Sequence, residues 1–267
     1  FSISNYNITG GTIILDGSGT QTLRGARDYR NLTFSVSGTK GISASINNIT
    51  GTVTVGNTVI LDVASNTMGG TGTNLTMTGT SLYRTAGSSL LKPDAAGTYS
   101  LGTGTSIEFT NSLAGLESIR LTGAGTVNYY NIIVSGNSVG TATLGTGIRF
   151  QTGGSITVKT NGVFKHTNTA GFSGGVTTAI SNTNNPAVIL ETGSTIEYNG
   201  TDQTITNQVI SSPADANYQH LKLSNTGNKT ASAGTLTIKG NLDKEGNATF
   251  IHNSGTVILN GTAVQGY

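Results

Sequence analysis

The chain has 267 residues, of which Gly, Thr, Ser and Asn make up about half, while 10% are charged and the formal net charge is +2. This composition excludes a helical protein, because these residues favour turns and strands. The absence of Cys excludes disulfides and thiolate chemistry. The small net charge argues against a nucleic-acid partner, and no apolar run is long enough for membrane insertion.

Short alternating runs of apolar and polar residues follow one another along the chain, with Gly, Asn or Ser in nearly every gap. This pattern predicts many short strands. No helical apolar period persists for three turns, so we expect essentially no α-helix. The clearest strand candidates are 11–15, 30–36, 42–46, 58–63, 105–109, 127–134, 155–159, 194–198, 219–224, 235–239 and 256–260.

A first motif, a strand followed by a Gly turn and a glutamine, occurs three times. Its copies are 11–17 with Gln21, 193–200 with Gln203 and 255–261 with Gln265, and a degenerate copy lies at 105–110. We expect the three glutamines to be structural, because a side-chain amide can satisfy backbone groups that such a turn leaves unpaired.

A second motif reads Tyr-x-Asn/His-Φ-x-Φ-Ser, where Φ is apolar, and occurs at 29–35, 129–135 and 218–224. It follows the first motif or its degenerate copy each time. We expect the rings of Tyr29, Tyr129 and Tyr218 to cover the ends of coils, with their hydroxyl groups reaching water.

The spacing of the first motif favours a solenoid. Its equivalent residues Ile13, Ile107, Ile196 and Val257 are unequally spaced, and the last interval is about a third shorter than the first. A repeated closed sandwich would resist such variation, whereas a solenoid can lose coils and keep its cross-section. The gaps between consecutive strands predict coils of roughly 20–25 residues.

We therefore predict an all-β, right-handed parallel β-helix over residues 1–267, a single continuous segment with modules starting near 11, 104, 193 and 255. Tandem antiparallel β-sandwich domains are the alternative, since Asn-Gly turns could close hairpins. Alternation at i and i+2 predicts which residues point inward. These are Ile13, Leu15, Leu32, Phe34, Ile132, Val134, Ile196, Tyr198, Leu221, Leu223, Leu236, Ile238, Val257 and Leu259.

The sequence points to no catalytic residue, cofactor or metal site. Glu108, Glu191 and Glu197 each lie beside a strand motif. Glu108 and Glu197 occupy equivalent positions between two apolar residues, so we interpret them as exposed strand charges and not as catalytic groups. The histidines are far apart and do not form a ligand pair on one strand. They are His166, His220 and His252.

Arg24, Arg27 and Arg30 form the one local cluster of positive charge. A solvated loop is the simpler interpretation, and contact with an anionic glycan is the functional one. Thr-x-Thr pairs such as Thr52-Val-Thr54 are frequent, but their intervals are irregular, so the sequence does not predict an ordered hydroxyl face for binding ice.

The two motifs, followed by Gly-x-Leu-Thr-Ile-x-Gly-Asn-Leu, are carried together by residues 193–242. This combination resembles repeats in giant secreted surface proteins of Bacteroidota, among them gliding-motility adhesins and other cargo of type IX secretion. The resemblance covers most of the chain and is weakest at 64–104. It implies an extracellular, cell-surface protein that is filamentous or adhesive, and it transfers no functional residue.

We expect a structural or adhesive segment of a surface adhesin that extends and presents binding regions. A polysaccharide-binding β-helix module is the alternative, and a polysaccharide-degrading enzyme is less favoured. Both ends carry strand and turn motifs in the same phase, which leads us to expect an internal stretch of a longer array. The expected partners are flanking segments, further copies of the chain and surface polysaccharide.

Overall fold

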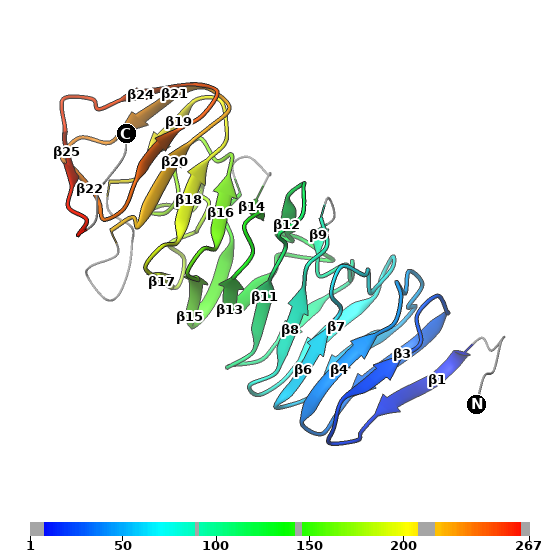
Figure 1. The fold of residues 1–267 in the computed structure, drawn as a ribbon. Helices are drawn as coiled ribbons and strands as arrows, with labels where there is room; N and C mark the ends of the chain where they lie inside the picture. Colours follow the sequence, from blue (N-terminus) through cyan, green and yellow to red (C-terminus); the bar gives the residue numbers. More distant parts are fainter. Residues whose placement is uncertain (1–7, 89–90, 142–145, 208–216, 263–267) are drawn as a thin grey trace.

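A computed structural model describes residues 8–88, 91–141, 146–207 and 217–262. These residues form 25 strands and no helix, and hence no helix that could cross a membrane. All pairs between the named strands are parallel, and the coils stack as a β-solenoid of about 11 turns (Figure 1). The predicted solenoid is confirmed, and the alternative of antiparallel sandwiches is excluded.

Each turn visits three sides of the solenoid, and five sheets form these sides. The first sheet contains β1 (Ile8–Leu15), β3 (Tyr29–Phe34), β5 (Thr52–Val55), β7 (Asn74–Met77) and β10 (Tyr99–Leu101). The second contains β2 (Gln21–Leu23), β4 (Gly38–Ile42), β6 (Val59–Asp62), β8 (Leu82–Thr85), β11 (Ser106–Phe109), β13 (Asn128–Val134), β15 (Arg149–Val158) and β17 (Ala187–Leu190).

The third sheet contains β9 (Leu91–Lys92), β12 (Glu117–Ile119), β14 (Val139–Thr141), β16 (Val163–His166), β18 (Thr195–Tyr198), β20 (His220–Leu223) and β23 (Leu242–Lys244). The fourth contains β19 (Gln203–Ile205), β21 (Thr226–Ala231) and β24 (Asn247–Ile251). The fifth pairs β22 (Thr235–Ile238) with β25 (Thr256–Leu259).

One hydrophobic core runs through the stack, because alternate strand residues face the inside of every coil. The residues predicted to point inward do so. Eleven of them are buried, and Ile13, Val257 and Leu259, which lie on coils at the two ends, are partly buried against the same core.

Coil length varies while the strand register stays constant. Leu32, Val53 and Leu75 stand side by side on successive coils, each within the predicted length of roughly 20–25 residues from the next. Ile156 and Val188 are also register partners, although the coil that separates them is about one and a half times as long as those coils. The connections between strands therefore absorb insertions without disturbing the ladder.

The two sequence motifs are neighbouring coils. The first-motif residues Ile13, Ile107 and Ile196 each pair in register with a second-motif residue. Their partners are Leu32, Ile132 and Leu221. The three motif pairs lie in the first, second and third sheets, so the same pairing serves each of these sides of the solenoid.

The second motif's tyrosines differ from the prediction. Tyr29, Tyr129 and Tyr218 are buried. Their hydroxyl groups donate to the backbone carbonyl oxygens of Arg24, Arg120 and Thr206, each at 2.7 Å. The expectation that these hydroxyls reach water is wrong, because a backbone carbonyl of the preceding connection accepts the hydrogen bond in place of water.

The third position of the second motif holds either Asn or His, because both side chains can accept a hydrogen bond from the following coil. Asn31 Oδ1 accepts from the Thr52 N–H at 2.9 Å. His220 Nδ1 accepts from the Asn241 N–H, also at 2.9 Å. A single side-chain acceptor thus aligns the next coil where the backbone ladder begins.

The glutamines of the first motif satisfy the turns, as predicted. The Gly17 N–H donates to Gln21 Oε1 at 2.9 Å, and the Gly200 N–H donates to Gln203 Oε1 at 2.7 Å. Gln265 lies outside the described residues. Both turns therefore have their backbone groups paired by the same device.

A buried lysine from the next coil completes each of these two turns. Lys40 is the register partner of Gln21, and its ammonium donates to the carbonyls of Gly17 and Gly19. Lys229 is the partner of Gln203 and donates to the carbonyls of Gly200 and Thr201. Burial lowers the pKa of Lys229 from its usual value. The carbonyl oxygens replace the water that a buried ammonium loses.

Removing one whole coil should preserve the fold, whereas removing half a coil should not. Deleting residues 53–74 joins Thr52 to Leu75, which takes the register position of Val53. We expect this variant to keep an all-strand circular dichroism spectrum and one cooperative unfolding transition. Deleting only 53–63 exchanges inward and outward residues and should abolish that transition. A half-coil deletion that stays cooperative would contradict the solenoid register.

Replacing Lys40 should destabilise the protein. In Lys40→Met the carbonyls of Gly17 and Gly19 lose a buried donor, so the free energy of unfolding should fall by about 1–3 kcal/mol. The matched control is Lys239→Met, because no partner of the Lys239 ammonium is found among the described residues. Urea unfolding should place the control within about 0.5 kcal/mol of the parent. Equal losses in the two variants would refute the capping role.

Candidate functional site

The predicted glycan-contact residues Arg24, Arg27 and Arg30 lie at and between β2 and β3, on one corner of the solenoid. Arg24 and Arg30 are exposed, and Arg27 is half-buried with its Nη1 donating to the Ala26 carbonyl at 2.8 Å. The three arginines share this corner, which is not part of the grooves described below. Their contact with an anionic glycan stays a prediction.

The strand carboxylates belong to charge ladders between coils. Arg84 pairs with Asp62 of the preceding coil at 3.4 Å and with Glu108 of the following coil at 2.8 Å. Glu108 also accepts a hydrogen bond from Ser135 Oγ at 2.6 Å. Opposite charges in register stabilise the stacking of neighbouring coils.

The interpretation of Glu108 and Glu197 as exposed charges is wrong, because only 16% of the Glu108 side chain and 3% of Glu197 are exposed. Lys165 and Lys222 flank Glu197 on the two neighbouring strands, at 3.6 and 3.8 Å. Ser224 Oγ, from the second motif, donates to Glu197 Oε1 at 2.7 Å. Glu191, by contrast, is one-third exposed and pairs with Lys159 at 2.7 Å.

A shallow groove of about 580 Å³ lies on the third side of the solenoid, near its N-terminal end. There the coils touch through isolated bridges, such as Ile46 to Met68 and Gly70 to Ala95. The lining residues come from the connections after β4, β6, β9 and β12 and from the start of β9. They are Ile46, Asn47, Thr67, Gly69, Gly70, Thr71, Leu91, Asp94, Ala96 and Arg120.

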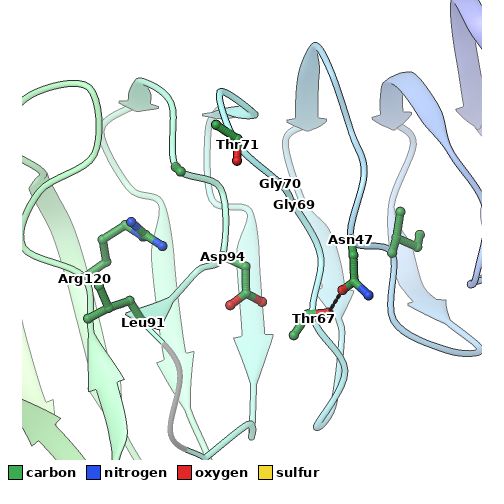
Figure 2. A pocket seen from close by; sticks show the side chains of 10 residues that line it. Asn47, Thr67, Gly69, Gly70, Thr71, Leu91, Asp94 and Arg120 are labelled. Carbon is green, nitrogen blue, oxygen red and sulfur yellow. Dashed lines mark hydrogen bonds between the residues drawn. The ribbon is translucent and has the colours of Figure 1, made fainter.

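Asp94 is the central polar group of this groove, between Arg120 and the Asn47–Thr67 pair (Figure 2). Its Oδ2 accepts from the Met68 N–H at 3.1 Å and from the buried Lys92 ammonium at 2.9 Å. The carboxylate is therefore held by an internal charge and a backbone donor. It is a fixed acceptor facing the groove.

Arg120 is also held in place, because its Nε donates to the Pro93 carbonyl at 2.8 Å and its Nη1 to the Thr122 carbonyl at 3.4 Å. Leu91 adds an exposed apolar side chain. The groove thus offers a fixed acid, a fixed guanidinium and a small apolar wall. This set can bind a polar ligand, and it contains no nucleophile paired with a general base.

Glu117 lies inside the solenoid behind this region and is fully buried. Its Oε2 accepts from the Asn111 N–H at 3.0 Å. Burial raises the pKa of Glu117 to about 7, and the Asp94 charge adds to this effect while the Lys92 charge opposes it. Burial and the same two carboxylates also raise the pKa of Tyr83. The interior here therefore carries a carboxyl group that is neutral in mildly acidic solution.

His166 lies in a second polar part of the interior, between Phe164, Phe172 and Tyr198. Burial lowers its pKa to about 3, and the Lys229 charge acts in the same direction, so the ring is neutral. Among the described residues, no group of three or more His, Asp or Glu could hold a metal ion.

A second, polar groove of about 430 Å³ lies over the fourth sheet. It is lined by Thr169, Asp202, Gln203, Thr204, Asn228 and Thr230. Asp202 Oδ1 already accepts from the Asn228 N–H at 2.7 Å, so the groove has one carboxylate that is partly occupied.

No protein-family model, curated protein or solved structure matches this chain. The grooves were not apparent from the sequence, because their residues come from corners of different coils. The one local signal is Lys92-Pro-Asp94, where a charged pair in an apolar coil indicates a buried ion pair.

The buried Glu117 should make stability depend on pH with a definite sign. Its pKa is about 7 in the folded protein and 4.5 ordinarily, so its favourable contribution is full below pH 4.5 and lost as pH rises to 7. Glu117→Gln stays neutral. Its free energy of unfolding relative to the parent should therefore increase by about 3 kcal/mol over this interval.

Comparison with the parent is needed because the lowered pKa of His166 gives the opposite slope between about 3 and 6.5. The matched control is Glu191→Gln, since Lys159 lowers the pKa of Glu191. Its stability relative to the parent should not increase with pH. Urea unfolding at several pH values measures both differences, and parallel profiles for Glu117→Gln and the parent would contradict the assignment.

Proposed function

We propose that this segment is a stiff spacer in a large secreted protein of the cell surface, where it extends and presents adhesive regions away from the cell. The observation that carries the proposal is the continuous stack of about 11 coils around one core. The resemblance of residues 193–242 to repeats of giant Bacteroidota adhesins and type IX secretion cargo supports the extracellular location. The proposal assigns no catalysis to the segment.

Contacts between coils account for the stiffness. The parallel backbone ladders join each coil to the next on up to three sides. Ion pairs also link successive coils along the stack, for instance from Lys165 through Glu197 and Lys222 to Glu245. At ~4.8 Å per coil the stack of about 11 coils spans roughly 50 Å, and one core runs through it.

The terminal strands supply the surfaces for the proposed partners, which are flanking segments or further copies. Among the described residues, β1 pairs with β3 alone and β25 with β22 alone. Ile14 on β1 and Ile258 on β25 are 57% and 40% exposed. Open edges with apolar side chains favour further strand pairing.

Polysaccharide binding is the second candidate, and the Asp94 groove is the observation in its favour. A fixed carboxylate and a fixed guanidinium at its wall suit the hydroxyl groups of a sugar. In this case the solenoid would position the groove instead of acting only as a spacer.

A distance measurement separates the two candidates. Because the chain has no Cys, Thr22→Cys and Thr256→Cys allow specific labels near opposite ends. The spacer predicts one narrow distance distribution that a panel of glycans does not change, and no retention on a glycan array. If the parent binds a defined glycan tightly or cleaves it, and Asp94→Asn does not, the spacer proposal is wrong. The protein is then a glycan-binding module or an enzyme.

Self-association should depend on the terminal strands. We expect sedimentation velocity to show association that increases with concentration and is weakened in Ile14→Pro and Ile258→Lys, which disrupt pairing at the two edges. Val176→Lys is the matched control, because Val176 is at least as exposed as Ile14 and Ile258 but lies outside the strands. A parent protein that stays monomeric at high concentration would refute end-to-end stacking.

A further inference from the structure

The outward face of the first sheet carries two columns of short polar side chains. The first column follows the strand register from one coil to the next through Thr33, Thr54, Thr76 and Ser100, and the apolar Ile14 precedes it on β1. The second column runs two residues earlier on each strand through Thr12, Asn31, Thr52, Asn74 and Thr98.

The columns are regular in space although their intervals in sequence vary. The three intervals that separate Thr33, Thr54, Thr76 and Ser100 all differ in length. Corners absorb these differences, and the parallel ladder places the side chains ~4.8 Å apart along the stack and about 6.7 Å apart along each strand. The irregular intervals therefore conceal an ordered hydroxyl face.

This face is free of charge over three coils. The outward residues of β5, β7 and β10 are Thr, Asn and Ser, and Arg30 at the edge of β3 is the nearest cation on the sheet. The second and third sheets instead carry the ion-pair ladders. Within the described part of the chain, the hydroxyls of Thr33, Thr54 and Thr76 have no hydrogen-bond partner.

The chemistry of threonine orders this face further. A β-branched side chain on a strand has few χ1 rotamers, so its hydroxyl and methyl groups hold nearly fixed positions. The asparagines are fixed as well, since Asn31 and Asn74 accept the N–H groups of Thr52 and Thr98 at 2.9 and 2.8 Å. The array is thus organised before any ligand binds.

We propose that the outward face of β3, β5, β7 and β10 binds an ordered water lattice, namely the surface of ice. The spacings along and across the strands are close to the oxygen spacings on faces of hexagonal ice. Hydroxyls can continue the hydrogen-bonded lattice, while methyl groups order the first water layer. A polysaccharide fits less well, because the outward positions of these strands hold no aromatic platform for sugar rings.

Ice-affinity partitioning tests this inference, which does not depend on the spacer function. When ice grows slowly in a dilute solution of the protein, a binder is enriched in the ice fraction and an inert protein is rejected into the liquid. We expect the parent to be enriched, and Thr54→Lys and Thr76→Lys each to be rejected like an inert protein. Thr54→Val, which keeps the methyl group and replaces the hydroxyl with a second methyl group, should lose only part of the enrichment.

Thr157→Lys is the matched control, because Thr157 is an outward strand residue of the second sheet, on β15. It should remain enriched, and circular dichroism should show all four variants folded. Rejection of the parent, or enrichment of both Thr54→Lys and Thr76→Lys, would overturn the proposal. The proposal is also overturned if the parent is rejected from ice and instead binds crystalline cellulose or self-associates, and Thr54→Lys abolishes that binding or association.

Discussion

The structure depends on the in-register parallel pairing of inward residues from one coil to the next. In each pair of motifs an apolar residue of the first stands beside an apolar residue of the second, as Ile196 does beside Leu221. Because strand side chains alternate with a period of two, a shift of one residue would expose the core of the whole coil. This penalty fixes the register, and the connections only have to span the corners.

Corners create a second requirement, because they leave backbone groups unpaired inside a narrow body. The chain meets it with polar side chains whose apolar parts remain in the core. Gln203 and Lys229 satisfy one turn from two different coils. Tyr129 donates to the carbonyl of Arg120. A chain in which Gly, Thr, Ser and Asn make up about half of the residues can therefore bury its backbone without many large apolar side chains.

The sequence predicted the parallel solenoid and its inward residues, because the period of two and the recurrence of motifs are local properties. It also predicted the roles of Gln21 and Gln203, whose partners lie within the same turn. It did not predict the burial of Glu197, since the lysines that cover this residue lie on the two neighbouring coils, far from it in the chain. Coils of unequal length conceal such partners.

The same reason explains why the groove and the threonine columns were missed. Asp94 faces a groove assembled from corners of several coils, and Thr54 stands beside Thr76 only after corners have absorbed the unequal intervals. Composition could suggest the residue types for an ordered face, but the alignment between coils is a property of the register. The register is thus the link between the fold and both candidate surfaces.

A disulfide between neighbouring coils tests the register most directly. Thr54 and Thr76 are register partners, so their Cα atoms should lie ~4.8 Å apart, within the range that a disulfide spans. In a chain without other cysteines, the double variant Thr54→Cys, Thr76→Cys should oxidise to an intramolecular disulfide in the folded state. The pair Thr54→Cys, Thr157→Cys should stay reduced. Failure of the first pair to form, or formation of the second, would contradict the stacking of these coils.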